Sequence, residues 1–101
     1  MTLKAAFIFL APDVDPDKDR QTVVTPQVEL TAVAVSNYTE AEKLAVKLVK
    51  EGIQAIELCG GFGNMGTARI AQAVAGKVAV GVVRFDGHPG LDGKSGDELF
   101  K

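Results

Sequence analysis

The chain has little of the chemistry that builds disulfides or metal centres. Its 101 residues include one cysteine, one histidine and no tryptophan. A single cysteine excludes an internal disulfide and fits a reducing compartment. One cysteine with one histidine does not supply the ligand set of a zinc site. We therefore expect no metal site, and the composition points to no particular cofactor.

Long apolar runs and an excess of basic residues are also missing. The longest apolar run, Ala5–Ala11, is far shorter than the roughly 20 residues that span a bilayer. Only Lys4 precedes it and no cleavage pattern follows, so it is not typical of a signal peptide. The formal net charge is -2 and no run of Lys or Arg is present, which argues against nucleic acid. We expect a cytoplasmic protein with no membrane or nucleic-acid partner.

The regular elements follow from the spacing of apolar residues. Four apolar segments predict strands, at residues 3–10, 28–35, 55–59 and 78–85. Asp15 as an N-cap with Pro16 at the first helical position predicts a helix over 16–24. A capping box of Thr39 and Glu42, followed by an apolar stripe and Gly52 just past the end, predicts a second helix. A third is expected over 67–74.

Strands that alternate with helices predict parallel pairing through right-handed crossovers. We therefore expect one domain over residues 1–101, a small open doubly wound sheet of flavodoxin-like type. Its four strands should follow the order 2-1-3-4 with three helices, and residues 86–101 should form a loop and a tail. A chain of this length has a small core, which favours a homo-oligomer.

The stretch 53–66, IQAIELCGGFGNMG, predicts a ligand site. An apolar strand enters a turn that contains Gly60, Gly61, Gly63 and Asn64, and a helix begins just beyond it. Glycine lets a ligand approach bare backbone, and the first N–H groups of a helix lack intrahelical partners. Such a junction is typical of sites for phosphate or another small anion. A tight turn with no ligand is the alternative.

The same turn fits the spacing G-x-G-x-x-G from Gly61 to Gly66, and Asp86 lies 20 residues beyond it. These features match the formal fingerprint of dinucleotide-binding proteins. A complete dinucleotide fold needs two mononucleotide-binding halves, and this chain is too short for both. The pattern therefore favours a smaller ligand that carries a phosphate or a carboxylate.

Two charged residues near the turn could take part in binding. Arg84, at the end of the last strand, could pair with an anionic ligand or neutralise Glu57 on the neighbouring strand. Glu57 interrupts an apolar strand, so it needs a partner or has a raised pKa. Arg84 and Lys4 are the candidate partners.

Cys59, His88 and Asp86 could form a nucleophile, a base and an orienting group. Each also has a structural explanation, because free cysteine often acts as a small buried hydrophobe and Asp86-Gly87 is a turn dipeptide. Whether the protein is an enzyme stays open.

Four stretches, KAAFIFLAP, GIQAIELCGGFG, GTARIAQAV and VGVVRFDGHPGLDGKSGDEL, resemble a family of short prokaryotic proteins classed as a domain of unknown function. The resemblance covers nearly the whole chain. It implies a stand-alone α/β protein of about one hundred residues, and it implies no activity and no residue roles. Less specifically, IELCGG is similar to strand ends of phosphate-binding βα barrels, which adds a barrel of two chains as an alternative.

Three functions follow as hypotheses. The first is binding of a small anion at the glycine turn, helped by Arg84. The second is a thiol-dependent reaction of Cys59 and His88. The third is a non-catalytic assembly protein, in which the tail and Phe100 pack on another subunit.

Overall fold

The computed structural model describes residues 2–85 and 87–100. Asp86 lies outside the described residues. The regular elements in chain order are β1 (Leu3–Leu10), β2 (Arg20–Val24), β3 (Val28–Val35), α1 (Tyr38–Lys50), β4 (Ala55–Leu58), α2 (Asn64–Val74), β5 (Ala79–Val82), a single 3-10 turn η1 (Pro89–Leu91) and α3 (Gly96–Leu99).

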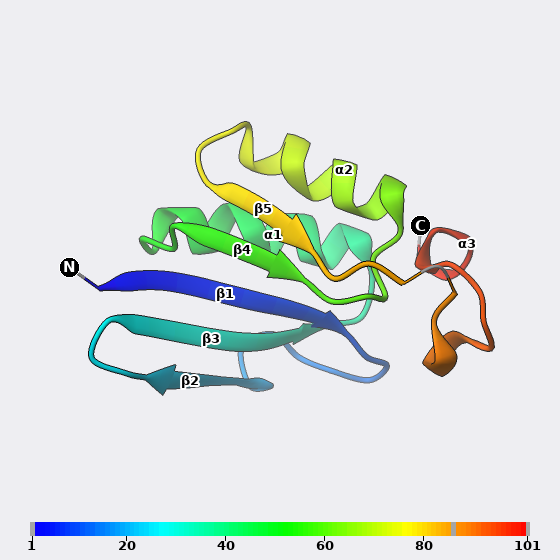
Figure 1. The fold of residues 1–101 in the computed structure, drawn as a ribbon, viewed down its shortest axis with the longest axis horizontal. Coiled ribbons are helices and arrows are strands. Elements are labelled where there is room, and N and C mark those ends of the chain that lie inside the picture. Colours follow the sequence, from blue (N-terminus) through cyan, green and yellow to red (C-terminus); the bar gives the residue numbers. More distant parts are fainter. Residues whose placement is uncertain (1, 86, 101) are drawn as a thin grey trace.

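The strands form one mixed sheet in the order β2-β3-β1-β4-β5 (Figure 1). The four predicted strands are β3, β1, β4 and β5, they are mutually parallel, and they lie in the expected order. The prediction of a purely parallel four-stranded sheet is wrong, because β2 adds an antiparallel edge strand beside β3.

The helix predicted over residues 16–24 is also wrong. Asp15 does cap a turn, since its Oδ1 accepts from the N–H of Asp17 at 2.9 Å. The chain makes only one helical turn, in which the N–H of Asp19 donates to the carbonyl of Asp15. The chain then extends into β2, whose last three residues are the β-branched Thr22, Val23 and Val24. Branched residues lose side-chain freedom in a helix and fit a pleated strand.

The core lies between the sheet and the two long helices, which cover one face of the sheet (Figure 1). In the middle of β1, β3 and β4 the apolar residues that face the helices are fully buried, as are the helix residues opposite them, whereas those of β5 are partly buried. The largest of these side chains are Ile8, Val33, Val35, Tyr38, Leu48, Ile56, Leu58 and Ile70.

Both long helices lie on the same face for a topological reason. The crossovers β3-α1-β4 and β4-α2-β5 step across the sheet in one direction. Right-handed crossovers that step in one direction place their helices on one face. The step from β1 to β3 runs the opposite way, and β2 stands there in place of a helix. Helices on both faces were expected, but in the described part of the chain the second face has none.

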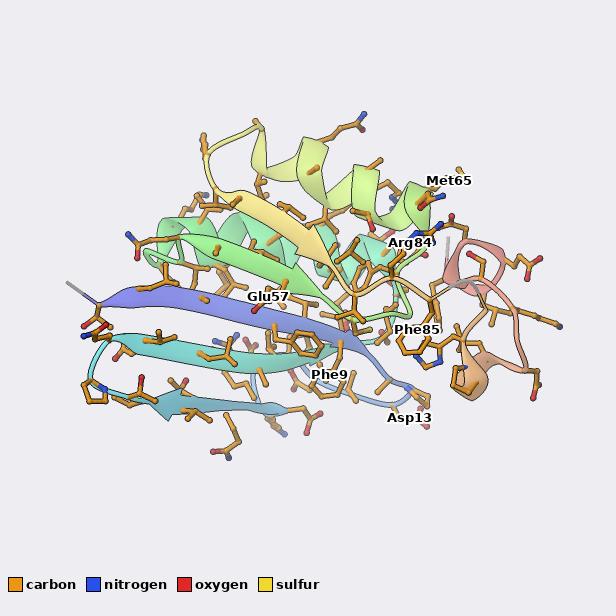
Figure 2. All side chains as sticks on the ribbon, viewed as in Figure 1. Phe9, Asp13, Glu57, Met65, Arg84 and Phe85 are labelled. Atoms are coloured by element: carbon orange, nitrogen blue, oxygen red, sulfur yellow. The ribbon has the colours of Figure 1, made fainter. Side chains whose placement is uncertain are left out.

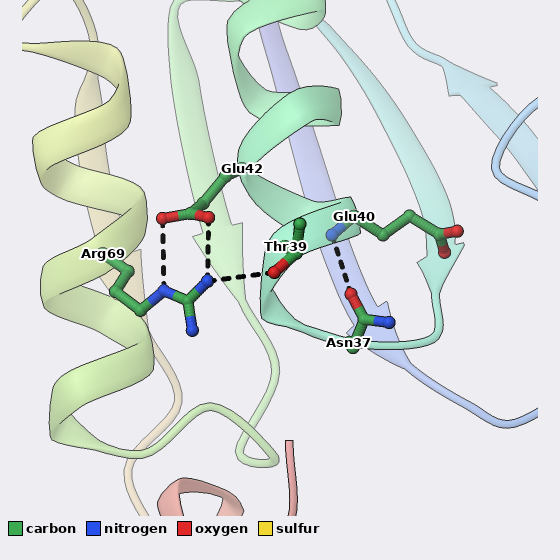
Figure 3. A network of polar contacts seen from close by, with 5 residues as sticks. All are labelled: Asn37, Thr39, Glu40, Glu42 and Arg69. Atoms are coloured by element: carbon green, nitrogen blue, oxygen red, sulfur yellow. Dashed lines mark hydrogen bonds and ion pairs between the residues drawn. The ribbon is translucent and has the colours of Figure 1, made fainter. Parts of the chain in front are cut away.

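The first helix begins two residues earlier than predicted. Its N-cap is Asn37, whose Oδ1 accepts from the N–H of Glu40 at 2.8 Å (Figure 3). The capping box of Thr39 and Glu42 is therefore wrong. At the other end Gly52 follows the C-cap with a φ of 96°, as the sequence predicted. No helix among the described residues is long and apolar enough to cross a bilayer.

Candidate functional site

Three connections meet at the carboxyl edge of the parallel strands, as the predicted topology requires (Figure 1). The end of β1 touches the glycine turn, since the N–H of Leu10, its last residue, donates to the Sγ of Cys59 at 3.4 Å. The segment after β5 also reaches the turn. There the ring of Phe85 lies so close over Gly60 that a Cβ at this position would overlap it. Glycine at position 60 therefore makes room for this ring.

The N–H groups of the turn point together onto one carboxylate, and that carboxylate belongs to the chain itself. The N–H of Met65 donates to Oδ2 of Asp97 at 3.1 Å, and the N–H of Gly66 donates to Oδ1 at 3.1 Å. A Cβ on Gly63 would overlap the same carboxylate. The junction of β4 and α2 thus holds a negative charge, which α3 supplies from 31 residues along the chain.

Tyr38 completes this site from the first turn of α1. Its hydroxyl donates to Oδ1 of Asp97 at 3.0 Å and accepts from the N–H of Gly63 at 3.0 Å. Gly66 lets the buried ring approach the backbone of α2, because a Cβ there would overlap the ring. Burial is the main cause that raises the pKa of Tyr38 to about 12. The hydroxyl is therefore protonated at neutral pH and serves as a donor to the carboxylate.

Opposing effects act on the Asp97 carboxyl. Burial raises its pKa, but the N–H groups of Met65 and Gly66 and the hydroxyl of Tyr38 favour the ionised form. The net result is a pKa below the ordinary value. Asp97 is thus an anion at neutral pH. It lies at the N-terminal end of α2, where the helix dipole favours negative charge.

Residues 95–100, which we call the C-terminal cap, hold Asp97 in place. The Oγ of Ser95 accepts from the N–H of Asp97 at 3.1 Å and starts α3. Gly96 is buried so close to the carbonyl of Gly61 that it has no room for a side chain. The ring of Phe100 packs on Tyr38, with 6.3 Å between ring centroids. Phe100 therefore packs within its own chain.

Cys59 and His88, the residues of the predicted thiol chemistry, each form hydrogen bonds with other groups. The Sγ of Cys59 accepts from the N–H groups of Leu10 and Gly61, at 3.4 and 3.3 Å. The Nδ1 of His88 accepts from the N–H of Gly90 at 3.0 Å, and its ring lies 4.6 Å from that of Phe85. No hydrogen bond joins Cys59 and His88 within residues 2–85 and 87–100. Asp86, the expected orienting group, lies outside the described residues.

Glu57 and Arg84 do not form the expected ion pair. Glu57 is exposed in the middle of the sheet, on the face away from the helices (Figure 2). Arg84 lies at the carboxyl edge of the sheet, where its Nη1 donates to the carbonyl of Phe85 at 3.4 Å. Lys4 does not pair with Glu57 either. The ion pairs of the described chain are Lys47 with Asp17 and Arg69 with Glu42.

Arg69 is a residue that the sequence did not single out. Its Nε and Nη2 hold the two carboxylate oxygens of Glu42 at 3.2 and 2.9 Å, and Nη2 also donates to the hydroxyl of Thr39 (Figure 3). The guanidinium lies 5.5 Å from the centre of the Tyr38 ring. Hydrogen bonding to Arg69 is the main cause that lowers the pKa of Glu42. Arg69 thus ties α2 to α1 beside the tyrosine of the site.

Tyr38 and Asp97 were also not identified from the sequence, although one feature of the sequence indicated that an acceptor was needed. Helix α2 has no acidic residue in its first turn and its N-cap is a glycine without a side-chain hydrogen bond. A helix start of this kind leaves N–H groups that need an acceptor from elsewhere. Nothing local to Asp97 identifies it as that acceptor.

The arrangement can hold a carboxylate or a group of similar charge and shape. In the part of the chain that the structure describes, no cluster of three His, Cys, Asp or Glu side chains is close enough to hold a metal ion. Comparison with curated proteins and with solved structures gave no significant match. A family model described as "Family of unknown function (DUF6506)" matches residues 3–98, and the chain belongs to that family.

Proposed function

We propose that this protein binds a small ligand bearing a carboxylate or a phosphate at the junction of β4 and α2, in exchange for the side chain of Asp97. The observation that carries the proposal is the carboxylate already seated on the N–H groups of Met65 and Gly66 and on the hydroxyl of Tyr38. Donors arranged to hold one carboxylate suit another anion of similar size.

The exchange has a defined cost, because Asp97 is tethered to its site. A tethered group competes as if present at about millimolar concentration or more. An external anion therefore needs contacts that Asp97 does not make. A phosphate offers additional acceptor oxygens, and Arg84 lies at the same edge of the sheet.

The C-terminal cap is the part of the chain that has to move. Its helix α3 spans only four residues. Short terminal elements open at a smaller free-energy cost than the core of a domain. Opening the cap exposes the donors and leaves the sheet and the two long helices unchanged.

The test removes the internal competitor and measures the effect of added anions on thermal stability. Asp97→Ala should lower Tm without added anion, and phosphate or acetate should raise it again. A free anion at ten times its Kd adds about 1.4 kcal/mol of stability, which is about 6–11 °C for a domain of this size. Arg84→Gln in the same background should raise the anion concentration needed for half of this shift.

Glu98→Ala is the matched control, because Glu98 is an exposed acid in the same short helix. It should leave Tm and the anion response of the wild type unchanged. Sodium chloride at equal ionic strength separates specific binding from screening. If Asp97→Ala responds to phosphate and acetate no more than to chloride, the junction does not bind anions and the proposal is wrong.

The two other hypotheses differ in their support. The thiol-dependent reaction stays a prediction, since the observed contacts of Cys59 and His88 are to other groups. Assembly draws support from the face of the sheet that no helix covers in residues 2–85 and 87–100.

A further inference from the structure

The face of the sheet opposite α1 and α2, here called the open face, carries apolar side chains from all five strands. The strand register puts on it Val23 of β2, Leu30 and Ala32 of β3, Leu3, Ala5, Phe7 and Phe9 of β1, Ala55 of β4 and Ala79 of β5. Among the strand positions of this face, Glu57 is the one charged side chain (Figure 2).

Such a composition is typical of a covered surface. Parallel strands that are apolar on both sides occur in sheets with both faces buried. Strands about 4.8 Å apart that rise about 3.3 Å per residue give this five-stranded face about 400–500 Å² in projection. Pairing two such faces buries about 800–1,000 Å² in total, which is the size of a weak, reversible interface.

The negative charge of Glu57 on the open face indicates the kind of surface that could cover it. Glu57, Phe7, Ala32 and Gln21 form one row across β4, β1, β3 and β2. In this row Glu57 lies on β4 and Ala32 lies on β3, and these two strands are the neighbours of β1 on its opposite sides. A two-fold axis along β1 therefore sets Glu57 of each copy over Ala32 of the other.

The surface around Ala32 suits a carboxylate. It is a shallow hollow of about 360 Å³, lined by Phe9, Lys18, Asp19, Arg20, Gln21 and Ala32. Lys18 is its cation for a carboxylate, because Arg20 pairs with Val33 on the face toward the helices and its Nε donates to the carbonyl of Pro16 at 2.9 Å. Asp19 is already occupied, since its Oδ2 accepts from the N–H of Asp15 at 2.8 Å. Lys18 is exposed and forms no ion pair within the described chain.

We propose that two copies of this chain pair through their open faces about a two-fold axis along β1, with Glu57 of each copy in the hollow of the other. Phe7 and Phe9 lie on the axis and pack on the same residues of the second copy, as closed two-fold interfaces require. The pairing gives Glu57 the cation that its own chain does not provide. It also covers the face that β2, in place of a helix, leaves bare.

The test is the molar mass of the protein by light scattering and sedimentation, followed by charge exchange. The wild type should have twice the mass of the 10.6 kDa chain at micromolar concentration. Glu57→Lys and Lys18→Glu should each raise the dissociation constant tenfold or more, because each opposes like charges. The double variant restores opposite charges and should recover most of the affinity.

Two valines provide matched variants of an apolar position. Val23 is 62% exposed on the open face and Val46 is 38% exposed on α1. Val23→Asp should dissociate the dimer, and Val46→Asp should not. Circular dichroism of each variant establishes that it is folded, and these exposed positions bear little on the core.

Three outcomes overturn the proposal. A wild type that stays monomeric at several hundred micromolar shows that the open face does not pair with itself. A dimer insensitive to Val23→Asp and Glu57→Lys pairs through a different surface. Weakening by both single charge changes without recovery in the double variant refutes the placement of Glu57 over the hollow. Asp97→Ala should leave the dimer intact, so this test is independent of anion binding.

Discussion

Replacing Gly63 by alanine should expel the Asp97 carboxylate from α2 without removing any donor or acceptor. Gly63 has φ -77° and ψ -176°, which alanine adopts without strain. The added Cβ would overlap the carboxylate carbon and both of its oxygens. The short side chain of Asp97 has few ways to avoid this contact while it keeps its hydrogen bonds.

The expected loss follows from the contacts of Asp97. It accepts from two N–H groups and one hydroxyl, each worth about 0.5–1.5 kcal/mol net. The helix dipole adds about 0.3–1 kcal/mol. Asp97 is half-buried, so solvent reduces these values. We expect Gly63→Ala to cost about 2 kcal/mol, which is roughly a 10 °C drop in Tm for a domain of this size.

A double-mutant cycle makes this prediction specific. Without the Asp97 side chain the Cβ at position 63 meets no carboxylate. Alanine at this position should then stabilise the fold by about 0.4–1 kcal/mol, because it reduces the conformational entropy of the unfolded chain. The double variant Gly63→Ala/Asp97→Ala should then be at least as stable as Asp97→Ala. The coupling free energy should be about 2.5–3 kcal/mol, measured by urea unfolding monitored by circular dichroism.

Gly81→Ala is the control for a glycine replacement, because a Cβ on Gly81 meets nothing within 4 Å. It should leave stability unchanged or raise it by up to about 1 kcal/mol, through the same effect on the unfolded state. Strictly additive losses in the cycle, or a Gly63→Ala variant as stable as the wild type, would refute the reasoning that Gly63 is glycine because Asp97 needs the space.

Two pH-dependent predictions follow from the same site. The pKa of Asp97 is lowered in the folded state, so its stabilising effect is present above 3.8 and is lost as pH falls through the folded value; the difference in unfolding free energy between wild type and Asp97→Ala should decrease as the solution is acidified below 3.8, and a difference that does not change with pH there contradicts this. The pKa of Tyr38 is raised to about 12, so stability that depends on its neutral hydroxyl is lost as pH rises from 10 through that value. Tyr38 is the one tyrosine of the chain, and tyrosinate absorbance that develops in folded protein near pH 10 would contradict its burial.

The order of the four parallel strands could be predicted because it depends on alternation and handedness, which the sequence carries. The segment 16–24 could not, because Asp15 and Pro16 are as suitable for a single turn as for a helix start. What decides between the two is pairing, and β2 gains the hydrogen bonds of β3 as its neighbour. That one replacement also removes the helix that would have covered the open face.

The site divides in a similar way. The glycine turn and the helix start after it could be predicted from residues 55–66, since a strand, glycines and a helix start are adjacent in the chain, but the N–H groups that hold the carboxylate are those of Met65 and Gly66. The identity of the anion does not follow, because Asp97 and Tyr38 reach the turn only after the sheet has brought the first turn of α1 and the C-terminal cap to the same edge.

The sequence by itself determined the four parallel strands and the helix start that follows the glycine turn, because these properties depend on neighbours within about ten residues. Only the tertiary structure decided that the anion at this helix start is the chain's own Asp97 and that one face of the sheet has no helix over it. Both depend on contacts between distant segments, where free energy of packing and hydrogen bonding selects among conformations that local sequence permits equally.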